Sequence, residues 1–212
     1  MTSTFRHARP PVYWTYLYST AWLGFIVIAV SLYQVMSRQM NYQWLGLTAL
    51  TIVVANCTIR IPGINSKISL SDIFVLLILI LFGPAAGCIS AALEALSGSL
   101  RCATKTRRLE FLMFNTGCVG LCAYISGLIY SAVHGTTLMR LAGSLPAALV
   151  LALSYHLLNS VTVAIMLALE SRQSVYTIWK ENFLWLSVNY LMCGFAAVLL
   201  ACNGNAMTPT II

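Results

Sequence analysis

The sequence predicts an all-α integral membrane protein, a bundle of about seven transmembrane helices. Hydrophobic residues make up 59% of the 212 residues and charged residues only 8%, whereas soluble domains carry about 25% charged residues. The mean hydropathy is +0.84. The apolar residues form long continuous runs. Such runs favour membrane helices over a membrane barrel, whose strands alternate in hydropathy over about ten residues.

Seven apolar runs follow one another along the chain, and no polar break between them is long enough to form a soluble domain. We therefore expect a single polytopic membrane domain at residues 16–202. A cytoplasmic N-terminal tail at 1–15 and a short C-terminal tail at 203–212 would flank it. The runs cover residues 16–36, 44–58, 70–82, 84–99, 111–133, 141–169 and 182–202.

The tract at 70–100 could form either one long helix or two short ones. One straight helix would measure about 46 Å, against about 30 Å for the hydrocarbon core of a bilayer. Gly83 suits the end of one helix and Pro84 the first turn of the next, while Ser71 and Asp72 can cap the start of the tract. If the tract forms two helices, each of them would be shorter than a usual transmembrane span. They would either cross the membrane twice or form a re-entrant hairpin.

The lysines and arginines decide between these two topologies. If 70–99 is a single span, the positive charges divide at best seven to five across the membrane. With a turn at Gly83-Pro84 and a cytoplasmic N-terminus, only Arg38 and Arg140 lie outside, which satisfies the positive-inside rule. We therefore predict two short helices, a turn near the outer face, and a cytoplasmic N-terminus. The ten residues then inside are Arg6, Arg9, Arg60, Lys67, Arg101, Lys105, Arg107, Arg108, Arg172 and Lys180.

Polar side chains inside the spans are the candidates for a ligand site, because burying them in hydrocarbon is expensive. In the predicted topology His156 lies near the membrane midplane, and the other candidates lie in the inner half. The alternative is that they only join helices by hydrogen bonds, each contributing about 0.6–2 kcal/mol. Glu94 would then form a structural ion pair, with Arg101 as one partner. The candidates for a polar pocket are Glu94, Asn115, His156, Asn159 and Asn189.

The basic stretch that follows Glu94 has two interpretations. Its residues could contact anionic lipid head groups, or they could simply mark a cytoplasmic loop. Gly83-x-x-x-Gly87 has the spacing of close helix packing, and a homodimer is the alternative use of it. The candidate lipid contacts are Arg101, Lys105, Arg107 and Arg108.

No motif points to catalysis, a cofactor or a metal. The seven cysteines show no CxxC spacing, and most fall in apolar runs, so we interpret them as small buried residues. The chain has no nucleophile elbow, phosphate loop, zinc motif or dinucleotide fingerprint. The net charge of +7 reflects loop topology, so we expect no nucleic-acid partner. Membrane lipids are the expected surroundings.

Three stretches together resemble the N-terminal membrane module of bacterial signalling proteins with cytoplasmic HD-GYP or GGDEF domains. They are "IRIPGINSKISLSDIFVLLILILFGPAAG" (59–87), "RRLEFLMFNTG" (107–117) and "LESRQSVYTIWKENFLWLSVNYL" (169–191). The resemblance implies a sensory or input-like module that spans the bacterial plasma (inner) membrane several times. The HD and GGDEF residues are absent from this sequence, so cyclic-di-GMP chemistry does not carry over. Any signal would pass to a partner chain.

A second resemblance concerns a shorter stretch. "SDIFVLLILILFGPAAG" (71–87) is similar to the substrate-binding subunits of energy-coupling-factor vitamin transporters, in which short helices also join at a Gly-Pro. This implies an alternative function, a small-molecule uptake subunit with an ATPase partner. A truncated fragment of a signalling protein is the third hypothesis.

Overall fold

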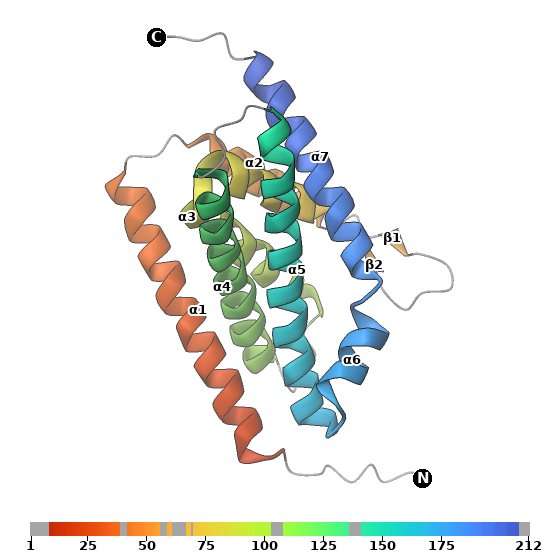
Figure 1. The fold of residues 1–212 in the computed structure, drawn as a ribbon. Coiled ribbons are helices and arrows are strands. Elements are labelled where there is room, and N and C mark those ends of the chain that lie inside the picture. Colours follow the sequence, from red (N-terminus) through yellow and green to blue (C-terminus); the bar gives the residue numbers. More distant parts are fainter. Residues whose placement is uncertain are drawn as a thin grey trace.

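The computed structural model describes residues 9–38, 42–55, 59–60, 67–68, 70–102, 108–135 and 141–207. They form long helices that lie side by side, with the start of α1 and the end of α7 at opposite ends of the bundle (Figure 1). The helices are α1 (Pro11–Ser37), α2 (Gln43–Val54), α3 (Ser71–Cys102), α4 (Arg108–Gly135), α5 (Leu141–Ser171), α6 (Val175–Asn182) and α7 (Leu186–Met207). Strands β1 (Ile59–Arg60) and β2 (Lys67–Ile68) pair antiparallel as a minimal ribbon.

Helix α3 is a hairpin of two arms, as the loop charges predicted. Gly83 has φ 83° and ψ −174°, a conformation that is essentially restricted to glycine. The Ser71 hydroxyl donates a hydrogen bond of 2.7 Å to a Glu94 carboxylate oxygen. In a straight helix these residues would lie about 34 Å apart. The chain therefore reverses at Gly83, and Pro84 begins the second arm.

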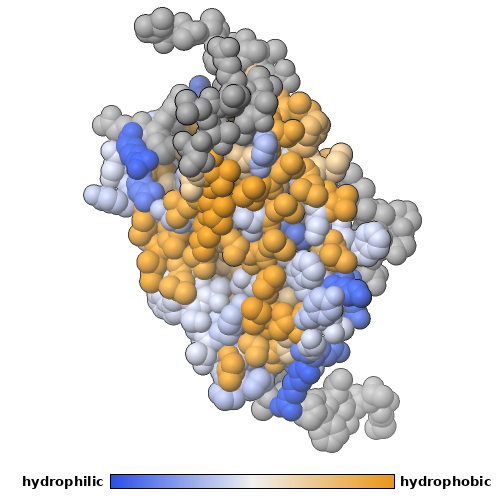
Figure 2. Space-filling model, viewed as in Figure 1, coloured by the Kyte–Doolittle hydropathy of each residue, from blue (hydrophilic) through white to orange (hydrophobic). Residues whose placement is uncertain are grey.

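The membrane-spanning helices agree with the predicted fold class. Among the described residues, α1, α3, α4 and α5 are long and apolar enough to cross a membrane, and the bent pair α6–α7 can form a fifth span. The seven apolar runs fall on α1, α2, the two arms of α3, α4, α5 and α7. The first arm of α3, at 71–82, is about 18 Å long and is shorter than a usual span, whereas the second arm, at 84–102, reaches about 28 Å and is longer than predicted. Hydrophobic residues form a broad band across the middle of the face in Figure 2, and strongly hydrophilic residues lie at its upper left and lower right edges.

Helix α1 packs against α4 through glycines. A Cβ atom added to Gly24 would lie 2.1 Å from the Gly117 carbonyl oxygen, and one added to Gly117 would lie 2.8 Å from the Ala21 carbonyl oxygen. Two backbones can approach this closely only where side chains are absent, which is a common way for membrane helices to associate. The closeness of α1 and α4 therefore depends on both glycines.

We predict that Gly24→Leu separates α1 from α4, because the new side chain has no space against the Gly117 backbone. The free energy of unfolding in detergent should fall by about 1–3 kcal/mol or more. Gly46→Leu is the control, since a Cβ at Gly46 meets nothing within 4 Å. Equal unfolding free energies for the two variants would contradict this account of the packing.

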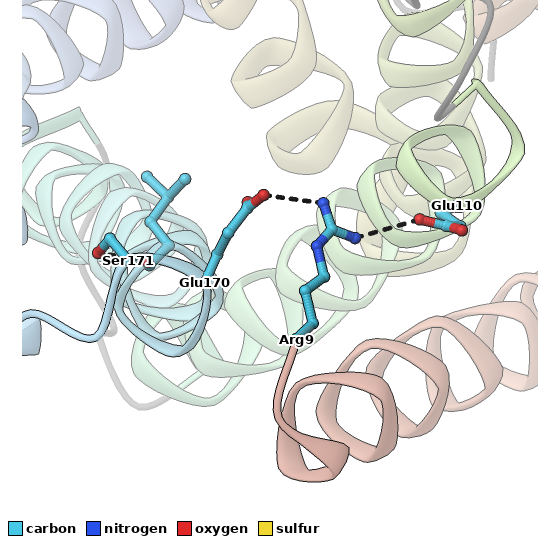
Figure 3. Close-up of polar contacts among 5 residues, drawn as sticks. Arg9, Glu110, Glu170 and Ser171 are labelled. Carbon is cyan, nitrogen blue, oxygen red and sulfur yellow. Dashed lines mark hydrogen bonds and ion pairs between the residues drawn. The ribbon is translucent and has the colours of Figure 1, made fainter. Parts of the chain in front are cut away.

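An arginine joins three helix ends at the N-terminal end of the bundle. Arg9 Nη1 lies 3.3 Å from Glu110 Oε2, near the start of α4, and Arg9 Nη2 lies 2.8 Å from Glu170 Oε1, near the end of α5. Figure 3 shows the guanidinium between the two carboxylates. It also lies over the Tyr13 ring, 4.3 Å from the centroid. From sequence alone Arg9 is only a loop charge, because these partners are distant in sequence.

We predict that Arg9→Gln lowers the free energy of unfolding by about 1–3 kcal/mol, because it leaves two carboxylates without their shared cation. Arg38→Gln is the matched control, because Arg38 is exposed and the described residues offer it no ion pair. Chemical unfolding in detergent at low and high salt measures the difference. No difference between the variants would show that the Arg9 contacts contribute nothing to stability.

Candidate functional site

A network of polar and aromatic side chains lies inside the bundle, where α3, α5 and α7 meet. The Tyr190 hydroxyl of α7 donates to Asp72 Oδ1 of α3 at 3.3 Å. The Tyr190 ring lies 4.8 Å from the His156 ring of α5, between centroids. His156 Nε2 is 2.9 Å from the Ser187 hydroxyl of α7. These contacts connect three helices, and the hairpin adds Glu94 through its bond to Ser71.

Local sequence explains how these groups meet. Ser71 lies twelve residues before Gly83 and Glu94 eleven residues after it, so the two arms bring the two positions opposite each other. Ser187 and Tyr190 are three residues apart on α7 and therefore share one face. His156 follows Tyr155 on α5, and both side chains are buried.

The electrostatics of the network are dominated by two carboxyl groups. Asp72 and Glu94 are close enough for each to affect the charge of the other, and Arg101 acts on Glu94 from two turns away. Among the described side chains no lysine or arginine forms an ion pair with either carboxyl. The hydroxyl donors are those of Tyr190 and Ser71.

The structure brings together only some of the predicted pocket residues. Glu94 and His156 belong to the network just described. Asn115 instead donates to the Ser99 hydroxyl at 2.7 Å and so joins α4 to the second arm of α3. Asn159 accepts from the Cys118 thiol at 3.8 Å, between α5 and α4. Asn189 is partly buried on α7, next to Tyr190 in the sequence.

The predicted lipid contacts are described only in part. Arg101 lies in the last turn of α3. Lys105 and Arg107, together with the side chain of Arg108, lie outside the described residues.

Sequence reasoning missed three members of the network, Asp72, Ser187 and Tyr190. Asp72 was interpreted only as a helix cap. Its signal was an acidic residue followed directly by a long apolar run, which needs a partner inside the bundle. Ser187 and Tyr190 carried no such signal, because hydroxyl groups are common in membrane helices.

Other features of the described residues offer no competing site within the bundle. No group of three His, Cys, Asp or Glu among them could hold a metal ion. A surface cavity of about 340 Å³ lies at the α6–α7 bend and contains none of the predicted pocket residues. The cavity is lined by Tyr176, Thr177, Lys180, Glu181 and Trp185.

Four cysteines are buried free thiols, as predicted. They are Cys88, Cys118, Cys122 and Cys193.

Comparison with protein families identifies the kind of protein to which this network belongs. The family model of the ECF transporter substrate-specific component matches residues 46–202, well over half of the chain. The chain belongs to this family. The matched region includes both arms of α3 and every residue of the network. Searches of curated proteins and of solved structures found no match.

This substrate-specific component is a multi-pass membrane protein. The family match also corrects the interpretation of the chain as a signalling module. The resemblance to membrane modules of HD-GYP and GGDEF proteins was wrong, and a role in cyclic-di-GMP signalling is not supported. The alternative prediction, a transporter subunit, is confirmed. The stretch at 71–87, on which that alternative rested, lies within the matched region.

Proposed function

We propose that this protein binds a vitamin-type small molecule at the network of Asp72, Glu94, His156 and Tyr190 and delivers it to a transport partner. The partner would be an ECF module made of an ATPase and a membrane-embedded T component. The family match supports a substrate-binding role. The location is supported by the cost of placing two partly buried carboxyls and a buried histidine in a membrane domain, which makes such groups functional candidates.

The observation that carries the proposal is the convergence of three helices on these groups. Asp72 and Glu94 come from the two arms of α3, His156 from α5 and Tyr190 from α7. A site built between helices can open when one helix moves, because its hydrogen bonds can be exchanged for bonds to a ligand. The Tyr190–Asp72 bond of 3.3 Å is longer than the usual 2.7–2.8 Å for a hydroxyl donor. It is the bond that a ligand would most easily replace.

The remaining asparagines have different proposed roles. Asn115 and Asn159 hold α4 against the hairpin and against α5, because their partners lie on those elements. Asn189 remains a candidate contact for the ligand through its position beside Tyr190. Arg101 would lie at the inner membrane surface, near anionic head groups. The protein itself would perform no covalent chemistry.

Mass spectrometry and co-purification test the proposed function. The tagged full-length protein is purified from its native membrane, and one half is denatured to release any bound small molecule. The other half is probed for a co-purified ATPase and T component. We expect one vitamin-sized ligand and both partner chains. A ligand-free protein that retains no ATPase would contradict the proposal.

We further propose that the N-terminus and the end carrying Arg9 face the cytoplasm, with residues 16–202 forming one membrane domain between two short tails. Single cysteines near Gly83 and near Lys105, in a protein without native cysteines, test this orientation. Membrane-impermeant reagents should label the Gly83 site from outside and the Lys105 site from inside. Labelling of both sites from the same side would contradict the proposed orientation.

A further inference from the structure

Two carboxyl groups of the network, those of Asp72 and Glu94, form no ion pair with a lysine or arginine of the described residues, although Arg101 acts on Glu94 from two turns away. Asp72 and Glu94 lie on facing arms of the hairpin and act on each other electrostatically. Their described hydrogen-bond donors are two hydroxyl groups, which carry no charge. Two negative charges inside a membrane domain are costly unless a proton or a cation neutralises them.

Aromatic rings lie next to these carboxyls. The Tyr190 ring is 5.8 Å from the Tyr155 ring and 4.8 Å from the His156 ring, between centroids. Its hydroxyl reaches Asp72, so the rings and the carboxyl groups belong to one site. Tyrosine faces attract organic cations through the ring quadrupole, most strongly where water is excluded. This attraction is independent of the carboxylate charges.

We propose that the substrate is an organic cation, with a quaternary or protonated nitrogen held between Asp72, Glu94 and the face of Tyr190. This inference rests on the proposed function and specifies its substrate class. An anionic substrate would meet two carboxylates and no described arginine or lysine within ion-pair distance. A cation neutralises the carboxylates and gains the aromatic contact as well.

The arrangement also indicates how binding would change the structure. A nitrogen centre between the two arms would compete for the carboxylate oxygens now bonded to Ser71 and Tyr190. Release of the Tyr190 hydroxyl would remove a polar contact between α7 and α3, and release of Ser71 would loosen the contact between the two arms. Ligand binding would therefore be accompanied by movement of α7 relative to the hairpin.

The experiment first determines the charge of the ligand released from the full-length protein, and then compares two probes of equal shape. Choline carries a quaternary nitrogen. Its uncharged isostere, 3,3-dimethylbutan-1-ol (dimethylbutanol), has a carbon atom in place of that nitrogen. Thermal stabilisation and equilibrium dialysis in detergent measure the binding of each probe and of the released ligand. We expect a cationic ligand, and stabilisation by choline but not by dimethylbutanol.

Charge-removing variants complete the test. Asp72→Asn and Glu94→Gln should each weaken binding of the cations about tenfold or more, and Asp72→Glu should restore part of it. Ser97→Ala is the control, because its hydroxyl bonds only to a backbone carbonyl of its own helix. Unliganded melting temperatures show whether each variant still folds, and the rescue by Asp72→Glu separates lost charge from lost structure.

The outcomes distinguish this inference from the function on which it rests. Release of a neutral or anionic ligand, with the ATPase partner present, would overturn the charge inference and leave the proposed function intact. Unchanged cation affinity in folded Asp72→Asn and Glu94→Gln variants would also overturn it, because the two acids would then be protonated structural groups. An empty protein without an ATPase partner would contradict both proposals.

Discussion

Replacing Gly83 by valine should open the α3 hairpin and abolish substrate binding. Gly83 has φ 83° and ψ −174°, and a β-branched residue in this region costs about 1–3 kcal/mol from backbone strain alone. The larger effect is geometric. If the arms splay or change register, Ser71 and Glu94 separate, and Asp72 moves away from Tyr190. One substitution at the turn therefore disrupts a site that begins eleven residues away.

The measurement combines unfolding in detergent with binding of the co-purified ligand. Gly98→Ala is the matched control in the same helix, because a Cβ there meets only the tip of Arg101 at 4.0 Å, and alanine favours helix. We expect the control to bind normally and to unfold at the same or a higher temperature. Normal binding by Gly83→Val would show that the hairpin turn does not position the site.

Replacing His156 by alanine should reduce substrate affinity about tenfold or more. The imidazole is 2% exposed, lies against the Tyr190 ring and meets the Ser187 hydroxyl at 2.9 Å. Its loss removes one wall of the site and frees Tyr190 to rotate. Ser187→Ala removes only the hydrogen bond and keeps the ring contact, so its effect should be smaller.

Ser154→Ala on the same helix is the control for His156→Ala, because its hydroxyl bonds to the Leu151 carbonyl within α5. Ligand affinity and melting temperature are measured on the same samples. A variant that melts like the unsubstituted protein and binds tenfold more weakly supports a role in the site. A variant that loses stability and keeps its affinity would show that His156 only joins α5 to α7.

The fold could largely be predicted from the sequence, because membrane topology depends on local properties. Apolar run length fixed the positions of the helices, and the distribution of charges around Gly83-Pro84 distinguished a hairpin from a single span. The same reasoning placed Glu94 in the arm that returns toward the basic loop. These features need no knowledge of which helices touch.

The site was predicted only in part, because its contacts join residues far apart in sequence. Asp72 and Tyr190 are separated by 118 positions, and Arg9 reaches Glu170 across 161. Glu94 and His156 stood out because ionisable groups are rare inside spans. Asn115 and Asn159 stood out as polar amides inside spans, yet their contacts lie outside the network. Intramembrane polarity thus identified candidates but did not show which of them converge.

The first family interpretation failed for a related reason. Long stretches such as 169–191 consist of apolar, aromatic and basic residues that many membrane helices share, so their likeness reflected a common environment. The shorter stretch at 71–87 was more informative. Its Gly83-Pro84 turn gives the hairpin its geometry, and its Asp72 contacts Tyr190 of α7.

ATP-dependent uptake in proteoliposomes is the most direct test of the central claim, that this protein is a substrate-binding subunit using the Asp72–Glu94–His156–Tyr190 network. The full-length protein is reconstituted with its ECF module, and uptake of the co-purified ligand is followed with and without ATP. We predict uptake that requires both ATP and this protein and that is lost in the Glu94→Gln, His156→Ala double variant. Equal uptake by the double variant, or uptake without this protein, would contradict the account.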